Sequence, residues 1–327
     1  MKSSRYALRG SRRGLKAAPH HDCVICASEL VILRSAKRVS KDAWRIGWLT
    51  ALVALVAGPA SAQNWPAEWT RPVAPYRVVG SVYYVGSEGL SAFLIAGSKG
   101  HILLDGGMPD GGAALIEANI RKLGFRLEDV KILINTHAHI DHAGGLAQLK
   151  ADTKAKLYAS KGDEWSLEHG QHFGDNENGP TPYPAVKVDR TIRDGRAIKL
   201  GENAITPILT PGHTAGCTTW SLPVVERDRP LNVVFYCSTT VAGNRLVGNQ
   251  AYPKIVADYR ASFAKLKTLP ADVFLPNHPQ FADLAGKRRR VAQGGPNPFV
   301  DPDEMRRFVE ASEEAFEAEL AKQEAGR

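Results

Sequence analysis

Four residues that can bind a metal ion lie within one short stretch of the sequence. Segment 136–145 reads Thr-His-Ala-His-Ile-Asp-His-Ala-Gly-Gly, which places His137, His139, Asp141 and His142 close together. Burying so many polar side chains without partners is unfavourable, and an ordinary loop has no need of them. Imidazole and carboxylate groups are ligands of zinc in proteins. The segment therefore predicts a zinc site rather than a solvated His-rich loop.

Two later histidines stand in similar settings. His213 lies in Thr-Pro-Gly-His-Thr and His278 in Pro-Asn-His-Pro, and each follows a strand-like run. A single histidine in such a loop is usually structural, but these two complete a set of candidate ligands. The predicted metal ligands are His137, His139, Asp141, His142, His213 and His278.

The pattern around these residues predicts alternating strands and helices. Residues 130–134 form a short, β-branched run typical of a strand covered on both faces, and the His-rich segment follows its carboxyl end, where layered α/β folds place their sites. Further strands are expected at 78–85, 92–95, 101–104, 156–159, 204–209, 218–222, 232–236 and 273–275. Helices are expected at 113–123, 255–269 and 301–323. No linker interrupts this pattern, so we expect one domain with helices outside paired sheets.

The first 62 residues have the composition of an export signal. They carry 11 Lys or Arg and 3 acidic residues, a balance of 11 − 3 = +8, whereas residues 63–327 carry 31 of each sign. The uncharged, mostly apolar stretch 46–57 precedes small residues at 59–62, which suit a signal peptidase. That stretch is shorter than the roughly 20 residues of a membrane-spanning helix. We expect cleavage after Ala62 and a periplasmic domain over 63–327, an uncleaved anchor being the alternative.

The patterns T-H-x-H-x-D-H-x-G-G and P-G-H-T, followed by a late His, resemble the metallo-β-lactamase superfamily. The resemblance covers about 64–323 and implies an α/β fold, a four-layer αββα sandwich with metals at the edge of the two sheets. It also implies two zinc ions per chain, one bound by His137, His139 and His213 and the other by Asp141, His142 and His278. Asp105, in Leu-Leu-Asp-Gly-Gly, resembles the superfamily's Asp that contacts a ligand from behind, and a turn-forming Asp is the alternative.

The superfamily includes thioesterases, lactonases, nucleases and oxidoreductases, so local differences must indicate the substrate. Glyoxalase-II-like thioesterases and lactonases resemble one another in a bridging Asp at the end of a strand that corresponds here to 232–240, and this stretch has no carboxylate. H-x-H-x-D-H with a Ser at that strand end instead resembles the third subclass of class B β-lactamases. Segments 83–86, 172–175, 212–220 and 258–263 resemble that subclass as well.

This resemblance implies zinc-dependent hydrolysis of the β-lactam amide bond by a metal-bound hydroxide, and with it antibiotic resistance. Asp141 would accept a hydrogen bond from the hydroxide besides binding metal. Ser238 and Thr240 would contact the substrate, with strand-end capping as their alternative role. The alternative function is an exported dinuclear zinc hydrolase of another lactone, ester or thioester.

The expected partner is a small β-lactam molecule. Because residues 63–327 have a formal charge near zero and no basic stripe, nucleic acid is not an expected partner. We expect a monomer with no stable membrane association after cleavage.

The same resemblance implies that Cys217 and Cys237 form a disulfide between neighbouring strands. It would close a loop of 237 − 217 = 20 residues in an oxidising compartment. Two free buried thiols are the first alternative, and Cys237 as a metal ligand is the second.

Segment 161–184 is expected to be a long loop. Its aromatic residues Trp165, Phe173 and Tyr183 would flank the metals as an apolar wall or pack within the loop. We interpret His169 and His172 as part of the loop's structure.

Overall fold

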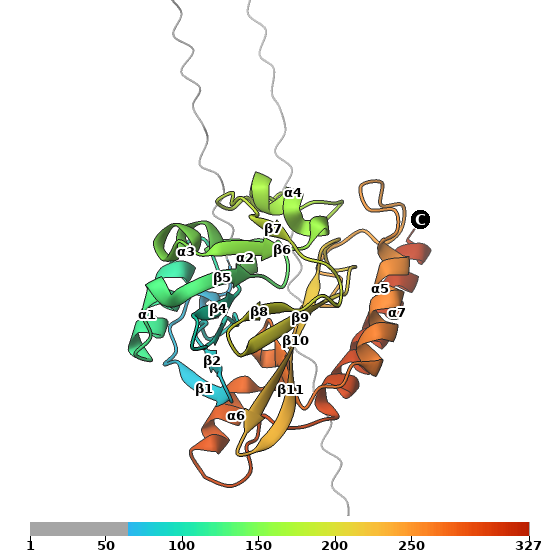
Figure 1. The fold of residues 1–327 in the computed structure, drawn as a ribbon. Helices are drawn as coiled ribbons and strands as arrows, with labels where there is room; N and C mark the ends of the chain where they lie inside the picture. Colours follow the sequence, from blue (N-terminus) through green and yellow to red (C-terminus); the bar gives the residue numbers. More distant parts are fainter. Residues whose placement is uncertain (1–64, 327) are drawn as a thin grey trace, which may run out of the picture. The chain divides into compact units, whose positions relative to one another are not determined.

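Two β-sheets of seven and five strands form the centre of the computed structural model, which describes residues 65–326 (Figure 1). The expected leader and its cleavage after Ala62 lie outside the described residues. The first sheet contains β1 (Tyr76–Val79), β2 (Val82–Tyr84), β3 (Phe93–Ile95), β4 (His101–Leu104), β5 (Val130–Ile134), β6 (Lys156–Ala159) and β7 (Arg190–Thr191), in that order. The second contains, in spatial order, β12 (Val273–Pro276), β11 (Arg229–Tyr236), β10 (Thr218–Glu226), β9 (Asn203–Leu209) and β8 (Ile198–Leu200).

Helices lie outside both sheets. They are α1 (Gly112–Lys122), α2 (Ile140–Ala143), α3 (Leu146–Thr153), α4 (Lys161–His169), α5 (Ile255–Thr268), α6 (Leu284–Val291) and α7 (Glu304–Ala325). Three short 3-10 helices, η1 (Ala67–Trp69), η2 (Leu127–Asp129) and η3 (Pro279–Ala282), complete the set. Figure 1 shows α1 and α3 on one outer side and α5 and α7 on the other.

Successive side chains of the central strands face two different cores, because side chains alternate across a strand. Leu103 and Leu133 pack with residues of α1 and α3, whereas Ile102, Leu104 and Ile134 pack with the second sheet. The first sheet is therefore covered on both faces, as its apolar sequence predicts. The described residues form the four-layer α/β sandwich expected from the sequence.

Trp220 of β10 connects the two sheets directly. Its side chain is fully buried, and its indole N–H donates a 3.0 Å hydrogen bond to the carbonyl of Asn135. Asn135 directly follows β5 and precedes the His-rich segment. A large apolar side chain with one polar atom therefore both fills the core and holds the backbone at the carboxyl end of β5.

Two expectations about local structure are wrong. The run 78–85 is a hairpin of β1 and β2 rather than one strand, because Gly80 takes a positive φ of 49° between them. Segment 161–184 begins with α4 rather than a loop: the Ser160 hydroxyl accepts from the Asp163 N–H at its start, and Gly170, with φ of 64°, follows its end. The other expected strands and helices are present, with ends displaced by a few residues.

Within residues 65–326, none of the helices combines the length and apolar character that a bilayer crossing requires.

The predicted disulfide between Cys217 and Cys237 is confirmed. Cys217 directly precedes β10 and Cys237 directly follows β11, and these strands pair antiparallel. Both sulfur atoms are used in the bond, so neither of the alternatives, free thiols or a Cys237 metal ligand, describes this site.

Replacing both cysteines by alanine is expected to lower the free energy of unfolding by about 3 kcal/mol, because the unfolded chain regains the freedom of a 20-residue loop. Urea denaturation of the wild-type and Cys217→Ala/Cys237→Ala proteins measures the difference. Equal stability of the two proteins would contradict a structural role for the bond.

Candidate metal centre

The six predicted ligands come from three loops that follow strands. His137 and His139 follow β5, with Asp141 and His142 in the short helix α2 directly after them. The loop after β9 carries His213, and the loop after β12 carries His278. The structure brings all three loops to one edge of the two sheets, as expected.

The Gly-Gly pair after the His-rich segment permits a close backbone approach. A Cβ on Gly145 would lie 2.2 Å from the carbonyl oxygen of Gly106, and one on Gly144 would lie 2.4 Å from that of Ile140. Both distances are far below van der Waals contact. A larger residue at either position would move the turn that contains Asp141 and His142.

His137, His139 and His213 form the first group of donors. One ligand atom from each lies within 4.8 Å of the others, and the Nε2 atoms of His137 and His213 are 3.1 Å apart. Nδ1 of His213 donates to the carbonyl of Thr240 at 2.7 Å, which leaves Nε2 with a free lone pair aimed at the other two rings. Three nitrogen donors therefore converge on one point.

Asp141, His142 and His278 meet beside the first group. The carboxylate Oδ2 of Asp141 is 3.1 Å from Nε2 of His142 and 3.4 Å from Nε2 of His278. The two imidazole Nε2 atoms are 3.3 Å apart. Ligand atoms of His137, Asp141 and His142 also lie within 4.8 Å of one another, so the two groups of donors are adjacent.

Asp105 contacts the candidate ligand His142 and the neighbouring Thr136. Its carboxylate accepts from the N–H of Thr136 at 2.6 Å and from the hydroxyl of Thr136 at 2.9 Å, and it lies 3.4 Å from Nδ1 of His142. Asp105 also has a positive φ of 65°. Both sequence interpretations therefore describe this residue, which makes a turn and contacts a candidate ligand.

Burial and neighbouring charges give the donors the protonation states that metal ligands need. Burial lowers the pKa of His137 and His139 well below the usual value, and that of His213 to about 4. Burial alone would raise the pKa of Asp141, but His142 and His278 hold it well below the usual value. Neutral imidazoles and an ionised carboxylate are ready to bind a cation.

His142 differs from the other imidazoles. Burial lowers its pKa, but the carboxylates of Asp141 and Asp105 raise it to about 10. Its Nδ1 is buried without a hydrogen-bond partner. Metal binding would displace the proton from this ring. The donor set as a whole fits a divalent cation, and its nitrogen and oxygen atoms favour zinc.

A cavity of about 300 Å³ opens over the donors. Its lining includes His139, Asp141, His213, His278, Trp65, Trp69, His172, Asn176, Thr240 and Ala242. Trp65 stacks on Trp69 with 5.4 Å between ring centroids, and Trp69 lies 5.8 Å from the ring of His278. The volume and the aromatic side suit a small organic molecule.

The aromatic residues of segment 161–184 do not line this cavity, and the alternative role, packing within their own segment, describes them. Trp165 and Phe173 are exposed and contact each other at 5.5 Å, and neither lines the cavity. Tyr183 is buried, and its hydroxyl donates to the carbonyl of Ala138 at 2.9 Å. The wall is formed instead by Trp65 and Trp69, which sequence reasoning missed.

His172 also differs from its interpretation as loop structure. Its Nδ1 lies 2.8 Å from Nε2 of His139, and its ring lines the cavity. His169, by contrast, stacks on Trp165 and bonds within α4, as a structural histidine would.

Ser238 and Thr240 have different surroundings. Ser238 is buried, its hydroxyl lies 3.1 Å from that of Thr240, and it is not among the residues that line the cavity. Thr240 lines the cavity, and its carbonyl accepts from both His213 and Tyr259. The hydroxyl of Ser238 accepts from the N–H of Thr240 at 3.2 Å, which is the expected capping contact, whereas Thr240 lines the cavity.

Asp163 is a residue that sequence reasoning missed. It is buried in the first turn of α4 and accepts three hydrogen bonds, from the N–H of Ala138, the N–H of Gly216 and the hydroxyl of Thr214. Burial raises its pKa to about 6, although the three donors favour the ionised form. Asp163 thus ties the His137–His139 loop to the loop of His213. The helix-start signal at Ser160 could have revealed it.

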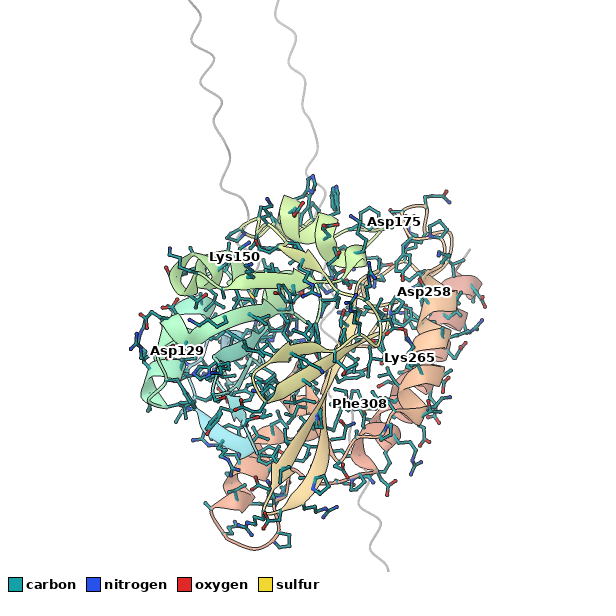
Figure 2. All side chains as sticks on the ribbon, viewed as in Figure 1. Asp129, Lys150, Asp175, Asp258, Lys265 and Phe308 are labelled. Atoms are coloured by element: carbon teal, nitrogen blue, oxygen red, sulfur yellow. A yellow bond between two sulfur atoms is a disulfide. The ribbon has the colours of Figure 1, made fainter. Side chains whose placement is uncertain are left out.

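Asn244 ties together the loops around the cavity. Its side-chain N–H donates to the carbonyl of His213 at 2.9 Å, and its side-chain oxygen accepts from Asn176 at 3.0 Å. The backbone carbonyl of the neighbouring Asp175 accepts from the N–H of Arg245 at 3.0 Å, and the carboxylate of Asp175, labelled in Figure 2, accepts from the N–H of Gln250 at 3.1 Å. Gln323 of α7 donates to the carbonyl of Asn244 at 3.2 Å and accepts from the N–H of Leu246 at 2.7 Å.

Comparison with known proteins agrees with this geometry. The family model described as the Metallo-beta-lactamase superfamily matches residues 86–278. BJP-1, a subclass B3 metallo-beta-lactamase of Bradyrhizobium japonicum, is similar in structure, with a TM-score of 0.76 and 43% identity, covering 80% of this chain and 98% of that one. The FEZ-1 metallo-beta-lactamase from Legionella gormanii gives a TM-score of 0.74 and 35% identity, covering 80% and 99%.

The curated relatives are named as hydroxyacylglutathione hydrolases, whereas the two similar solved structures are named as metallo-beta-lactamases. A hydroxyacylglutathione hydrolase of Brucella anthropi is 30% identical over 147 residues, which are 44% of this chain and 48% of that protein. The chain spans about half the length, or less, of the first curated relatives that it matches.

Asp163→Ala is expected to weaken zinc binding at least about tenfold, because three buried donors lose their acceptor and the two metal loops lose their common anchor. Competition with a chelating dye measures the affinity. Asp189→Ala is the matched control, since Asp189 accepts from the N–H of Leu157 and pairs with Lys150 away from the metal loops. Equal zinc affinity of wild-type and Asp163→Ala proteins would refute the anchoring role.

Proposed function

Because the chain belongs to the metallo-beta-lactamase superfamily, we propose that it is a zinc-dependent β-lactamase of subclass B3 that binds two zinc ions. The observation that carries this proposal is the second donor group. Asp141, His142 and His278 meet within 3.4 Å, and residues 232–240, which include the end of β11, contain no carboxylate. Directly after β11, Cys237 is in a disulfide and is followed by Ser238, Thr239 and Thr240.

Residues of this chain would orient the substrate and accept a proton from the attacking water. When bound, the zinc ions would polarise the substrate carbonyl and lower the pKa of a water molecule toward about 7. Oδ2 of Asp141 lies 3.1 Å from Nε2 of His142, and the ionised carboxylate would accept a hydrogen bond or a proton from the attacking water. Thr240 offers a hydroxyl to the substrate's polar groups, and Trp65 and Trp69 pack against its apolar part.

The curated relatives favour a second candidate, hydrolysis of a glutathione thioester. These relatives are named for that activity and are about 30% identical to this chain over part of their length. Residues 232–240 contain no carboxylate, and the bridging Asp expected of such thioesterases would lie in this stretch. This absence counts against the second candidate. The higher identity to BJP-1, over nearly all of that chain, also favours the β-lactamase.

We further propose that the enzyme acts as a monomer in the periplasm and confers β-lactam resistance. The composition of residues 1–62, with basic residues, an apolar stretch and small residues before the expected cleavage point, supports export. The disulfide supports an oxidising compartment.

We expect the zinc-loaded protein from residue 63 onward to open a penicillin, a cephalosporin and a carbapenem, and a chelator to abolish the reaction. Asp141→Asn should lower kcat/KM at least about 100-fold, since it removes both a charged ligand and a proton acceptor. The exposed turn residue Asp110, changed to Asn, is the matched control and should keep wild-type activity.

Ultraviolet absorbance follows the opening of each ring, and S-lactoylglutathione is tested in parallel. If the zinc-loaded protein leaves all three β-lactams intact, the β-lactamase proposal fails. Faster hydrolysis of the thioester than of any β-lactam would establish the second candidate instead.

A further inference from the structure

A second cavity lies between the hairpin of β1 and β2 and helix α6. Its volume is about 470 Å³, larger than that of the cavity over the metal ligands. The two cavities share none of their lining residues. The lining residues that could contact an occupant include Tyr76, Leu284, Ala285, Arg288 and Arg289.

Most of this lining is apolar. Tyr76 stacks on Tyr84 with 5.1 Å between ring centroids, and Val73 and Leu284 add aliphatic surface. The hydroxyl of Tyr84 is already used, since it donates to the carbonyl of Ser87 at 2.5 Å and lies 3.1 Å from that of Leu90. Burial raises the pKa of Tyr76, which therefore stays neutral. The cavity thus presents aromatic and aliphatic surface to an occupant.

Two guanidinium groups stand at this cavity without a carboxylate partner among residues 65–326. Arg288 lies over the ring of Tyr76 at 4.8 Å, and no ion pair within the described part of the chain includes Arg288 or Arg289. The next residue, Arg290, pairs instead with Asp283 at 3.3 Å and does not line the cavity. Glu88, the acidic residue in the lining, is already paired with Arg71 at 2.5 Å. Within residues 65–326, the positive charges of Arg288 and Arg289 are therefore not compensated by an ion pair, and they lie beside the apolar part of the cavity lining.

We propose that this cavity binds a small amphiphilic anion, a carboxylate joined to an aromatic or compact aliphatic group. Cavities that bind small molecules have volumes of roughly 300–1,000 Å³ and combine apolar walls with a few charged groups. A carboxylate would accept charge-assisted hydrogen bonds from Arg289 and Arg288. The apolar part would pack against Tyr76 and Leu284, with the Arg288 guanidinium already held over the aromatic ring.

Calorimetric titration with 2-naphthoate tests this proposal, with the neutral 2-naphthylmethanol as the uncharged comparison. The zinc-loaded wild-type protein should bind the carboxylate at least about tenfold more tightly than the alcohol. Arg288→Gln/Arg289→Gln should lose about that factor for the carboxylate and leave binding of the alcohol unchanged. Arg290→Gln is the matched control on the same helix and should bind both probes as the wild type does.

Two further measurements separate this cavity from the metal centre. Binding should persist after the zinc is removed by a chelator, because the cavity contains none of the metal donors. Ala285→Phe, which fills the cavity without changing its charge, should abolish binding of both probes. Thermal unfolding of each variant confirms that it is folded.

The proposal is overturned if wild-type protein shows no binding of 2-naphthoate or binds the alcohol equally well. It is also overturned if the arginine and phenylalanine variants bind as the wild type does. Binding that disappears with the zinc would place the carboxylate at the metal centre instead.

Discussion

The structure depends on bringing five imidazoles and one carboxylate together in a small space. The Nε2 atoms of His137 and His213 are 3.1 Å apart, and those of His142 and His278 are 3.3 Å apart. The lowered pKa values of His137, His139 and His213 keep these imidazoles neutral, so they direct lone pairs at the same point. In the second group, the raised pKa of His142 gives a protonated ring that pairs with the ionised Asp141. A cation would accept the lone pairs of the first group and replace the proton of His142, so the arrangement of the loops suits a metal.

Polar contacts from residues outside the ligand set hold several of the ligands and their loops in place. Asp105 holds Thr136 and approaches His142, Asp163 joins the loops that carry His137 and His213, and the carbonyl of Thr240 orients His213. The contacts of Asp105 and Asp163 are buried, and there the loss of a hydrogen bond to a carboxylate is costly. The sheets contribute by fixing where each loop begins: β5, β9 and β12 end at the same edge, and Trp220 bonds to the backbone at the end of β5.

The candidate ligands were predictable because four of them lie together in one short segment, and His213 and His278 complete that set. Three histidines and an aspartate within six positions are typical of a metal site, and apolar periodicity located most of the strands. The residues that support the ligands carry no such signal. Asn244 lies in a loop and has no sequence feature that distinguishes it; its role depends on the loops of His213 and Asn176, which are distant in sequence. Trp65 and Trp69 line the cavity from a segment whose Glu68 carbonyl accepts from the N–H of Gly89, which is also distant in sequence. Asp163 escapes prediction for another reason: the composition of segment 161–184 indicates a loop, which hides a residue in the first turn of a helix.

The last turn of α7 contributes to the position of the candidate ligand His213, although it is distant in sequence from every ligand. Gln323 holds the backbone of Asn244 and Leu246, and Asn244 in turn holds His213 and the segment of Asn176. The outer layer of the sandwich is therefore more than a cover for the second sheet. Natural variation on α7 can shift the alignment of a metal ligand and the width of the cavity together, so adaptation to a new substrate has a route that leaves every ligand unchanged.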